Sequence, residues 1–107
     1  MIKVTFYHFK DGAPAGFNFK GHSGYSSSGS DIVCAAVSSV AYMTANTIIE
    51  IMGIPAEAEV DEKGEMTLKV PYDSATKTKD ILSGLELHLK ELSGQYPKNV
   101  TITTTEV

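Results

Sequence analysis

The first third of the chain begins with a one-by-one alternation of apolar and polar residues. Residues 2–9 alternate in this way, and a turn centred on Asp11-Gly12 separates them from a second alternating run, 15–21. Alternation with a period of two is typical of strands with one buried face, so the pattern predicts an antiparallel hairpin. The same parity places His22 on the polar face, so we expect Gly21 and the residues after it to redirect this side chain.

The next long segment, 31–52, is apolar around most of its circumference and is followed by Gly53 and Pro55. This pattern predicts a long helix that these two residues end. Interspersed polar residues make a membrane span a poor interpretation. A helix that is apolar all round is usually covered on more than one side, so we expect a central layer or contact with a second subunit, as in a homodimer.

The second half of the chain predicts two more strands, a helix and a last strand. Alternating runs flank a turn at 62–64, the helix spans 75–93 with a single leucine-rich stripe, and the last strand spans 99–106. The order is ββαββαβ in one domain, 1–107, of the α+β class. We expect two helices packed between a two-strand and a three-strand antiparallel sheet. The alternative is one five-strand antiparallel sheet with both helices on one face.

Composition narrows the function classes. The formal net charge is −4, and all nine cationic residues are lysine, so no arginine can make bidentate contacts to phosphate or guanine. We therefore do not expect nucleic acid as a partner. The composition is 42% hydrophobic and 21% charged, which is ordinary for a globular protein, so we do not expect a membrane as a partner either.

A single cysteine cannot form an intrachain disulfide, and no signal peptide is recognisable at the N-terminus, so the expected location is cytoplasmic. His8 and His88 have no cysteine or carboxylate cluster at ligand spacing, so no metal or other cofactor is expected.

The candidate chemistry is that of a thiol nucleophile. Cys34 lies where the long helix is expected to begin, with Asp31 or Ser30 as its N-cap. Cysteine thiols near helix N-termini or beside an imidazolium ionise more readily, and unpaired N–H groups there can hold an oxyanion. His22 is the candidate general base, provided that the intervening segment folds back over the helix start.

Two motifs carry a family resemblance. Residues 21–25, Gly-His-Ser-Gly-Tyr, and residues 31–38, Asp-Ile-Val-Cys-Ala-Ala-Val-Ser, resemble the signature of the ribosomal-processing cysteine proteases, the Prp family. The resemblance implies a bacterial cytoplasmic endopeptidase that removes a short N-terminal extension from large-subunit ribosomal protein L-twenty-seven, after large apolar or aromatic residues. It implies a catalytic dyad of Cys34 and His22.

The same resemblance implies further residues of the site. Asp31 and Ser38 match two more positions of the family motif and are expected to support the dyad. The expected substrate loop contains Gly21, Ser23, Gly24, Tyr25 and Gly29. From the residues alone, this loop can close over the substrate or can be an ordinary solvated loop.

The residues themselves leave other roles open for Cys34, Asp31 and Ser38, and another reaction for the thiol. Cys34 can be a small buried hydrophobe, in which case the protein is a non-enzymatic ribosome-associated binding module. Asp31 can act only as an N-cap, and the Ser38 hydroxyl can bond back to the Cys34 carbonyl. A third possibility is hydrolysis of a small thioester or amide by the same thiol.

Overall fold

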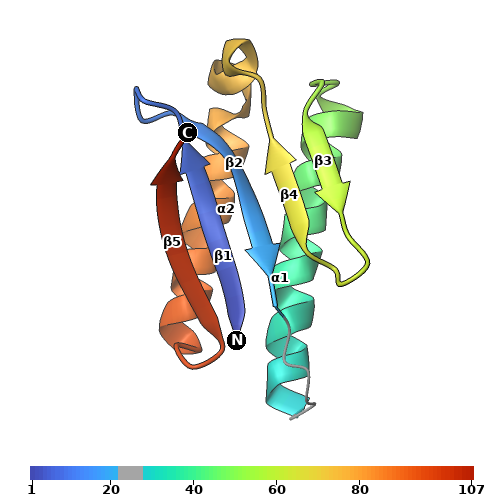
Figure 1. Ribbon diagram of the computed structural model, residues 1–107, viewed down its shortest axis with the longest axis vertical. Helices are drawn as coiled ribbons and strands as arrows, with labels where there is room; N and C mark the ends of the chain where they lie inside the picture. Colours follow the sequence, from blue (N-terminus) through green and yellow to red (C-terminus); the bar gives the residue numbers. More distant parts are fainter. Residues whose placement is uncertain (22–27) are drawn as a thin grey trace.

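The computed structural model describes the backbone of residues 1–21 and 28–107, and the side chains of 1–21 and 32–107. Five strands, two long helices and two short helical segments follow one another along the chain (Figure 1). Their bounds are β1 Ile2–His8, β2 Pro14–Lys20, α1 Ser28–Asn46, the π-helix η1 Thr47–Ile51, β3 Glu57–Val60, β4 Met66–Lys69, the 3-10 helix η2 Tyr72–Ser74, α2 Ala75–Gln95 and β5 Val100–Glu106. The sequence did not predict η1 and η2.

All five strands form one sheet in the order β3-β4-β2-β1-β5. The predicted split into two sheets is wrong, because β2 pairs with β4 and so joins the two hairpins. Gly16 lies at this junction with φ +147, and a Cβ there would overlap the Leu68 carbonyl oxygen, so the two strands approach closely only because the residue is glycine.

The sheet is mixed, so the antiparallel alternative is also wrong in one respect. β5 pairs with β1 in parallel, from Ile2 opposite Val100 to His8 opposite Glu106. Parallel neighbours need a crossover connection, and α2 supplies it by returning the chain to the end of the sheet where β1 begins. Alternation along a strand specifies its buried face but not the direction of its neighbour, so the sequence pattern could not distinguish the two pairings.

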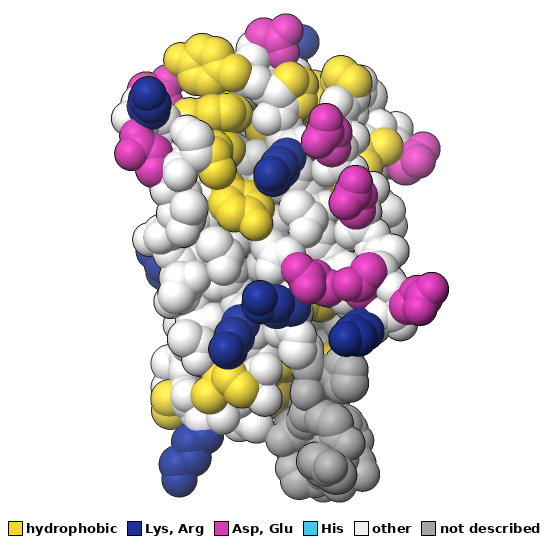
Figure 2. All heavy atoms as spheres, viewed as in Figure 1, with side chains coloured by type: hydrophobic (Ala, Val, Ile, Leu, Met, Phe, Trp, Pro, Cys, Tyr) yellow, Lys and Arg dark blue, Asp and Glu magenta, His cyan; other side chains and the backbone are white. Residues whose placement is uncertain are grey.

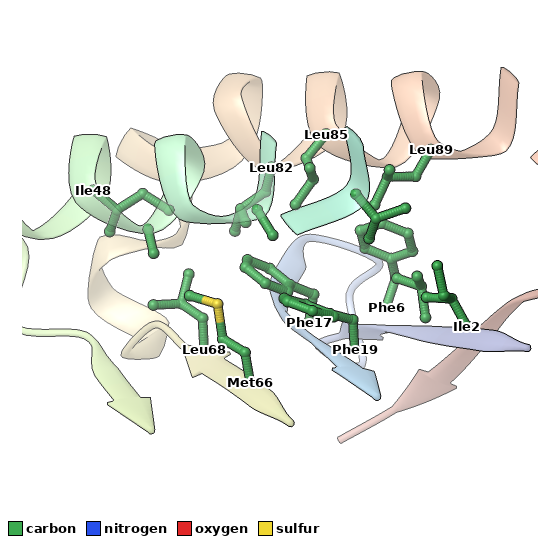
Figure 3. Close-up of a cluster of buried hydrophobic side chains, with 14 of the residues drawn as sticks. Ile2, Phe6, Phe17, Phe19, Ile48, Met66, Leu68, Leu82, Leu85 and Leu89 are labelled. Atoms are coloured by element: carbon green, nitrogen blue, oxygen red, sulfur yellow. The ribbon is translucent and has the colours of Figure 1, made fainter. Parts of the chain in front are cut away.

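Both helices cover the same face of the sheet (Figure 1). On that face, alternate strand residues point toward the helices and are almost fully buried, as Figure 3 shows for Phe17, Met66 and Leu68 beneath Ile48 and Leu82. The opposite face is open and mostly polar (Figure 2), with Thr5, Asn18 and Thr67 on the central strands. Asn18 is nevertheless buried, and its amide donates to Glu65 Oε2 and Thr67 Oγ1.

α1 packs on the sheet through one stripe of small and branched residues. The buried positions recur at helical spacing and continue into η1: Val33, Val37, Ala41, Thr44 and Ala45 in α1, and Ile48 in η1. The described residues do not cover the outward side of α1 and η1, where Ile32, Met43 and Ile51 are 66%, 52% and 80% exposed. The segment Ile32–Ile51, with mean hydropathy 1.7, is long and apolar enough to cross a membrane, a test that the core helix of a soluble protein also passes. In this structure the buried stripe of α1 faces the sheet.

Candidate active site

Cys34 lies on α1 at the edge of its buried stripe. Its neighbour Val33 is 2% exposed and Ile32 is exposed, while Cys34 itself is half-buried and packs against the hydrophobic core. The thiol is therefore anchored by packing on one side and accessible on the other. A fully buried structural cysteine would lack this access, so the placement favours the nucleophile over the buried hydrophobe.

The start of α1 differs from the prediction. α1 begins at Ser28, so Ser30 and Asp31 lie inside its first turn, and neither is the N-cap. Gly29 belongs to the same turn rather than to the segment before the helix. The unpaired N–H groups of a helix are those of its first four residues, here 28–31, so the free donors lie one turn before Cys34. The prediction places the helix start at the beginning of the apolar run, and the polar residues Ser28, Gly29 and Ser30 before that run give no hydrophobic signal.

Ser38 follows Cys34 by one helical turn and, like it, is half-buried. Residues four apart lie on the same side of a helix, so the Ser38 hydroxyl and the Cys34 thiol share one surface. Among the described residues the Ser38 hydroxyl makes no bond to the Cys34 carbonyl, whereas Thr44 makes that kind of bond to the Val40 carbonyl at 2.8 Å. The Ser38 hydroxyl therefore remains able to form a hydrogen bond with a group outside the backbone of α1.

Gly21 follows the last residue of β2 and has a left-handed backbone conformation. Its φ is +84, and a Cβ at this position would overlap the carbonyl oxygen of Met1. The end of β2 and the start of α1 lie at the same end of the molecule (Figure 1). His22, Ser23, Gly24 and Tyr25 lie outside the described residues, and the Asp31 side chain also lies outside them.

The two other histidines lie elsewhere. His88 is exposed on α2. His8 is the last residue of β1, and both of its ring nitrogens form hydrogen bonds. Its Nε2 lies 2.8 Å from Glu86 Oε1 and its Nδ1 lies 3.0 Å from the Gly12 carbonyl oxygen. No group of three or more His, Cys, Asp or Glu side chains within 1–21 and 32–107 is arranged to hold a metal ion.

The sequence analysis missed the cluster around His8. Glu86 also pairs with Lys90 at 2.8 Å. Burial raises the pKa of Glu86, but the hydrogen bonds and charges of Lys90 and His8 outweigh it, so this pKa lies below the ordinary value. The cluster borders a cavity of about 880 Å³, and the predicted site residues whose side chains or backbone the structure describes in full, Gly21, Cys34 and Ser38, do not line it. Only the i,i+4 pair of Glu86 and Lys90 was visible in the sequence, because His8 and Glu86 are 78 positions apart.

Comparisons with known proteins identify the family of the chain. The family model described as cysteine protease Prp matches residues 1–101. The ribosomal processing cysteine protease Prp of Bacillus subtilis (strain 168) is 25% identical over 109 residues, covering 97% of each chain. The crystal structure of SMU.848 from Streptococcus mutans is 26% identical with a TM-score of 0.88, covering 100% of this chain and 96% of that one.

A third relative shows the same fold at lower identity. The Prp protease from S. aureus, solved in complex with a substrate peptide, is 22% identical with a TM-score of 0.87, covering 98% of this chain and 100% of that one. The family model spans nearly the whole chain. The chain therefore belongs to the cysteine protease Prp family and is a cysteine endopeptidase.

Proposed function

We propose that Cys34 is the nucleophile and His22 the general base of this protease. One observation carries the assignment of the thiol: a cysteine protease needs a cysteine, and Cys34 is the only one in the chain. It is also half-buried rather than enclosed. His22 follows Gly21, whose bend leads the chain out of β2 toward the end of the molecule where α1 begins. His8 is bound to Glu86 at the opposite end of β1, which supports His22 as the base.

The proposed reaction has two steps. Cys34 Sγ attacks the scissile carbonyl carbon while His22 accepts the thiol proton, and His22 then protonates the departing amine, leaving a thioester on Cys34. Water, deprotonated by His22, hydrolyses the thioester and releases the second product. Free N–H groups at the start of α1 are the proposed donors to the oxyanion. Ser38, on the same side of α1 as the thiol, is proposed to contact the substrate or to orient His22, and Asp31 to orient His22.

The proposed substrate is the N-terminal extension of ribosomal protein L-twenty-seven, cut after large apolar or aromatic residues. The relative from Bacillus subtilis is named a ribosomal processing protease, and the S. aureus protease was solved with a substrate peptide. The exposed side of α1 offers apolar contacts near Cys34, beginning with Ile32. Such contacts suit an apolar peptide better than a small polar thioester or amide, and a thiol protease does not fit a non-enzymatic binding module.

The direct test is cleavage of a peptide spanning that extension, followed by mass spectrometry. We expect one discrete cut by the wild type and none by Cys34→Ala or His22→Ala, with all variants folded by circular dichroism. His88→Ala is the matched control, because His88 is exposed on α2, and it should cut like the wild type. Cleavage by Cys34→Ala would refute the mechanism, and cleavage lost in His88→Ala would refute the assignment of His22 as the specific base.

Two further proposals concern the setting of the enzyme. We propose a cytoplasmic location, because a lone nucleophilic thiol needs a reducing compartment. We also propose a homodimer. Support for self-association comes from surfaces that the described residues leave open, including the outward side of α1, where Ile32 and Met43 are exposed, and the two edges of the sheet.

A further inference from the structure

The helix side of the edge strand β3 is left uncovered by the described residues. β3 pairs only with β4, and all four of its residues are exposed. Ala58 lies opposite Leu68 of β4, and Val60 lies opposite Met66. Both β4 residues are buried beneath the helices, and residues directly opposite each other in antiparallel strands point to the same face. Val60 therefore points to the helix side, but it is 50% exposed.

One flank of α1 is turned toward this uncovered strand, and the handedness of the helix identifies it. In Figure 1 α1 rises behind the sheet with α2 on its left, and β3 forms the right-hand edge of the sheet. Val33, Val37 and Ala41 are buried and face the sheet. An α-helix is right-handed and turns by about 100° per residue, so the residue after each of these is turned away from α2 and toward the β3 edge. These residues are Cys34, Ser38 and Tyr42.

The row of Cys34, Ser38 and Tyr42 combines the proposed nucleophile with two free polar groups. Cys34 and Ser38 are half-buried, and Tyr42 is 42% exposed. Within the part of the chain that the structure describes, the hydroxyls of Ser38 and Tyr42 form no hydrogen bond. A tyrosine offers an apolar ring and a polar tip, which suits contact with both a side chain and the main chain of a bound peptide.

The row has the length of a short extended peptide. Each residue of an α-helix adds about 1.5 Å, so Tyr42 lies about 12 Å along α1 from Cys34. An extended peptide advances about 3.3 Å per residue, so a peptide that follows the row reaches Tyr42 roughly three or four residues from the bond that Cys34 attacks. The same path passes beside the uncovered helix side of β3, where Val60 adds apolar surface.

We propose that Tyr42 is a specificity-determining residue that receives a large apolar or aromatic side chain of the substrate, three or four positions before the cut. The inference rests on the proposed function of Cys34 and adds a subsite to it. The occupant is an extended peptide, because the chain is an endopeptidase and the substrate main chain has to pass the thiol. Residues before the cut occupy the row because those are the large apolar residues of the proposed substrate.

The outward side of α1 is the alternative path for the peptide, and the position of the thiol argues against it. Met43 is next to Tyr42 in the chain and is 52% exposed. Nine residues separate it from Cys34, which is roughly two and a half helical turns, so the two side chains project from opposite sides of α1. A peptide held against Met43 would therefore lie away from the thiol.

Paired substitutions in the enzyme and the peptide test the subsite. Peptides with Phe or Ala at the third or the fourth position before the cut are cleaved by the wild type and by Tyr42→Ala, and kcat/KM is measured for each combination. We expect the wild type to prefer Phe at one of these positions by roughly two- to tenfold, the size of an aromatic pair, and Tyr42→Ala to lose this preference. Tyr42→Phe should retain it, because the ring remains.

Met43→Ala is the matched control, since it removes an equally exposed side chain from the other side of the same helix. It should keep the preference for Phe. The rate at which iodoacetamide alkylates Cys34 should be the same in Tyr42→Ala, Met43→Ala and the wild type. Equal alkylation distinguishes a lost subsite from damage to the nucleophile.

The outcomes separate the subsite from the proposed function. Normal cleavage with an unchanged preference in Tyr42→Ala would overturn the subsite alone. A preference lost in Met43→Ala and kept in Tyr42→Ala would also overturn it, because the peptide would then follow the outward side of α1. A wild type that cleaves none of the peptides would overturn the proposed function and the subsite together.

Binding without turnover provides a second readout. In a Cys34→Ala background, fluorescence anisotropy of labelled peptides gives dissociation constants that do not depend on the chemical step. We expect Tyr42→Ala to raise the dissociation constant of the Phe peptide by roughly two- to tenfold and to leave that of the Ala peptide nearly unchanged. An equal rise for both peptides would contradict a contact between Tyr42 and that side chain.

Discussion

Gly21→Ala tests how the end of β2 positions the catalytic segment. The φ of +84 at Gly21 is unfavourable for alanine by roughly 1–2 kcal/mol. A Cβ would also overlap the Met1 carbonyl oxygen, and backbone atoms of β1 cannot move without disturbing the pairing of β1 with β2 and β5. We therefore expect a total cost of more than about 2 kcal/mol in the free energy of unfolding.

Gly12→Ala is the matched control for this variant. Gly12 has a similar φ of +90, but a Cβ there meets nothing within 4 Å, so only the conformational cost of roughly 1–2 kcal/mol applies. Urea unfolding of both variants separates the two contributions. Equal losses of stability would show that the contact with Met1 has no energetic consequence.

The same pair of variants connects this geometry with catalysis. If the bend at Gly21 directs His22 toward the start of α1, Gly21→Ala displaces the proposed base, and a displacement of about 1 Å lowers kcat/KM by about a hundredfold. Gly12 lies in the distant β1–β2 turn, so Gly12→Ala should cleave the peptide at the wild-type rate. Full activity in folded Gly21→Ala would refute the role of the bend.

Three further variants test the packing and electrostatics of the fold. Gly84→Ala should stabilise the protein by about 0.5–1 kcal/mol, because Gly84 is exposed inside α2 and a Cβ there meets nothing within 4 Å; a loss of stability on thermal unfolding would contradict this. Phe17→Ala should cost about 3–5 kcal/mol in urea unfolding, since Phe17 is 0% exposed, and a loss below 1 kcal/mol would mean that the core collapses around the gap. Glu86→Gln should lower stability at neutral pH, because the pKa of Glu86 is lowered in the folded state and the ionised carboxylate stabilises the fold. That contribution disappears as the pH falls through the folded-state pKa, so unfolding curves of the variant and the wild type should converge in acid, and a pH-independent gap would contradict the linkage.

Local patterns in the sequence predicted the strands and the two long helices. Alternation in residues 2–9 predicted β1, and the leucine stripe of 75–93 predicted α2, because strand and helix periods depend only on neighbouring residues. The sequence predicted the single cysteine, Cys34, as a nucleophile because the motif 31–38 contains it and the motif 21–25 precedes it. Gly21 was also identified as the point where the chain must turn, since parity alone placed His22 on the wrong face.

Tertiary structure decided how these elements combine. Gly16 allows β2 to approach β4, and this pairing merges two hairpins into one sheet, a contact between positions that no local pattern links. The parallel pairing of β5 with β1 depends on the path of α2 across the sheet. The start of α1 at Ser28, three residues before the predicted N-cap Asp31, moved the free N–H groups away from Cys34, because helix ends depend on capping contacts rather than on periodicity. The exposure of the outward side of α1 and of the two sheet edges, β3 and β5, also depends on how the elements pack and pair, which local patterns do not specify.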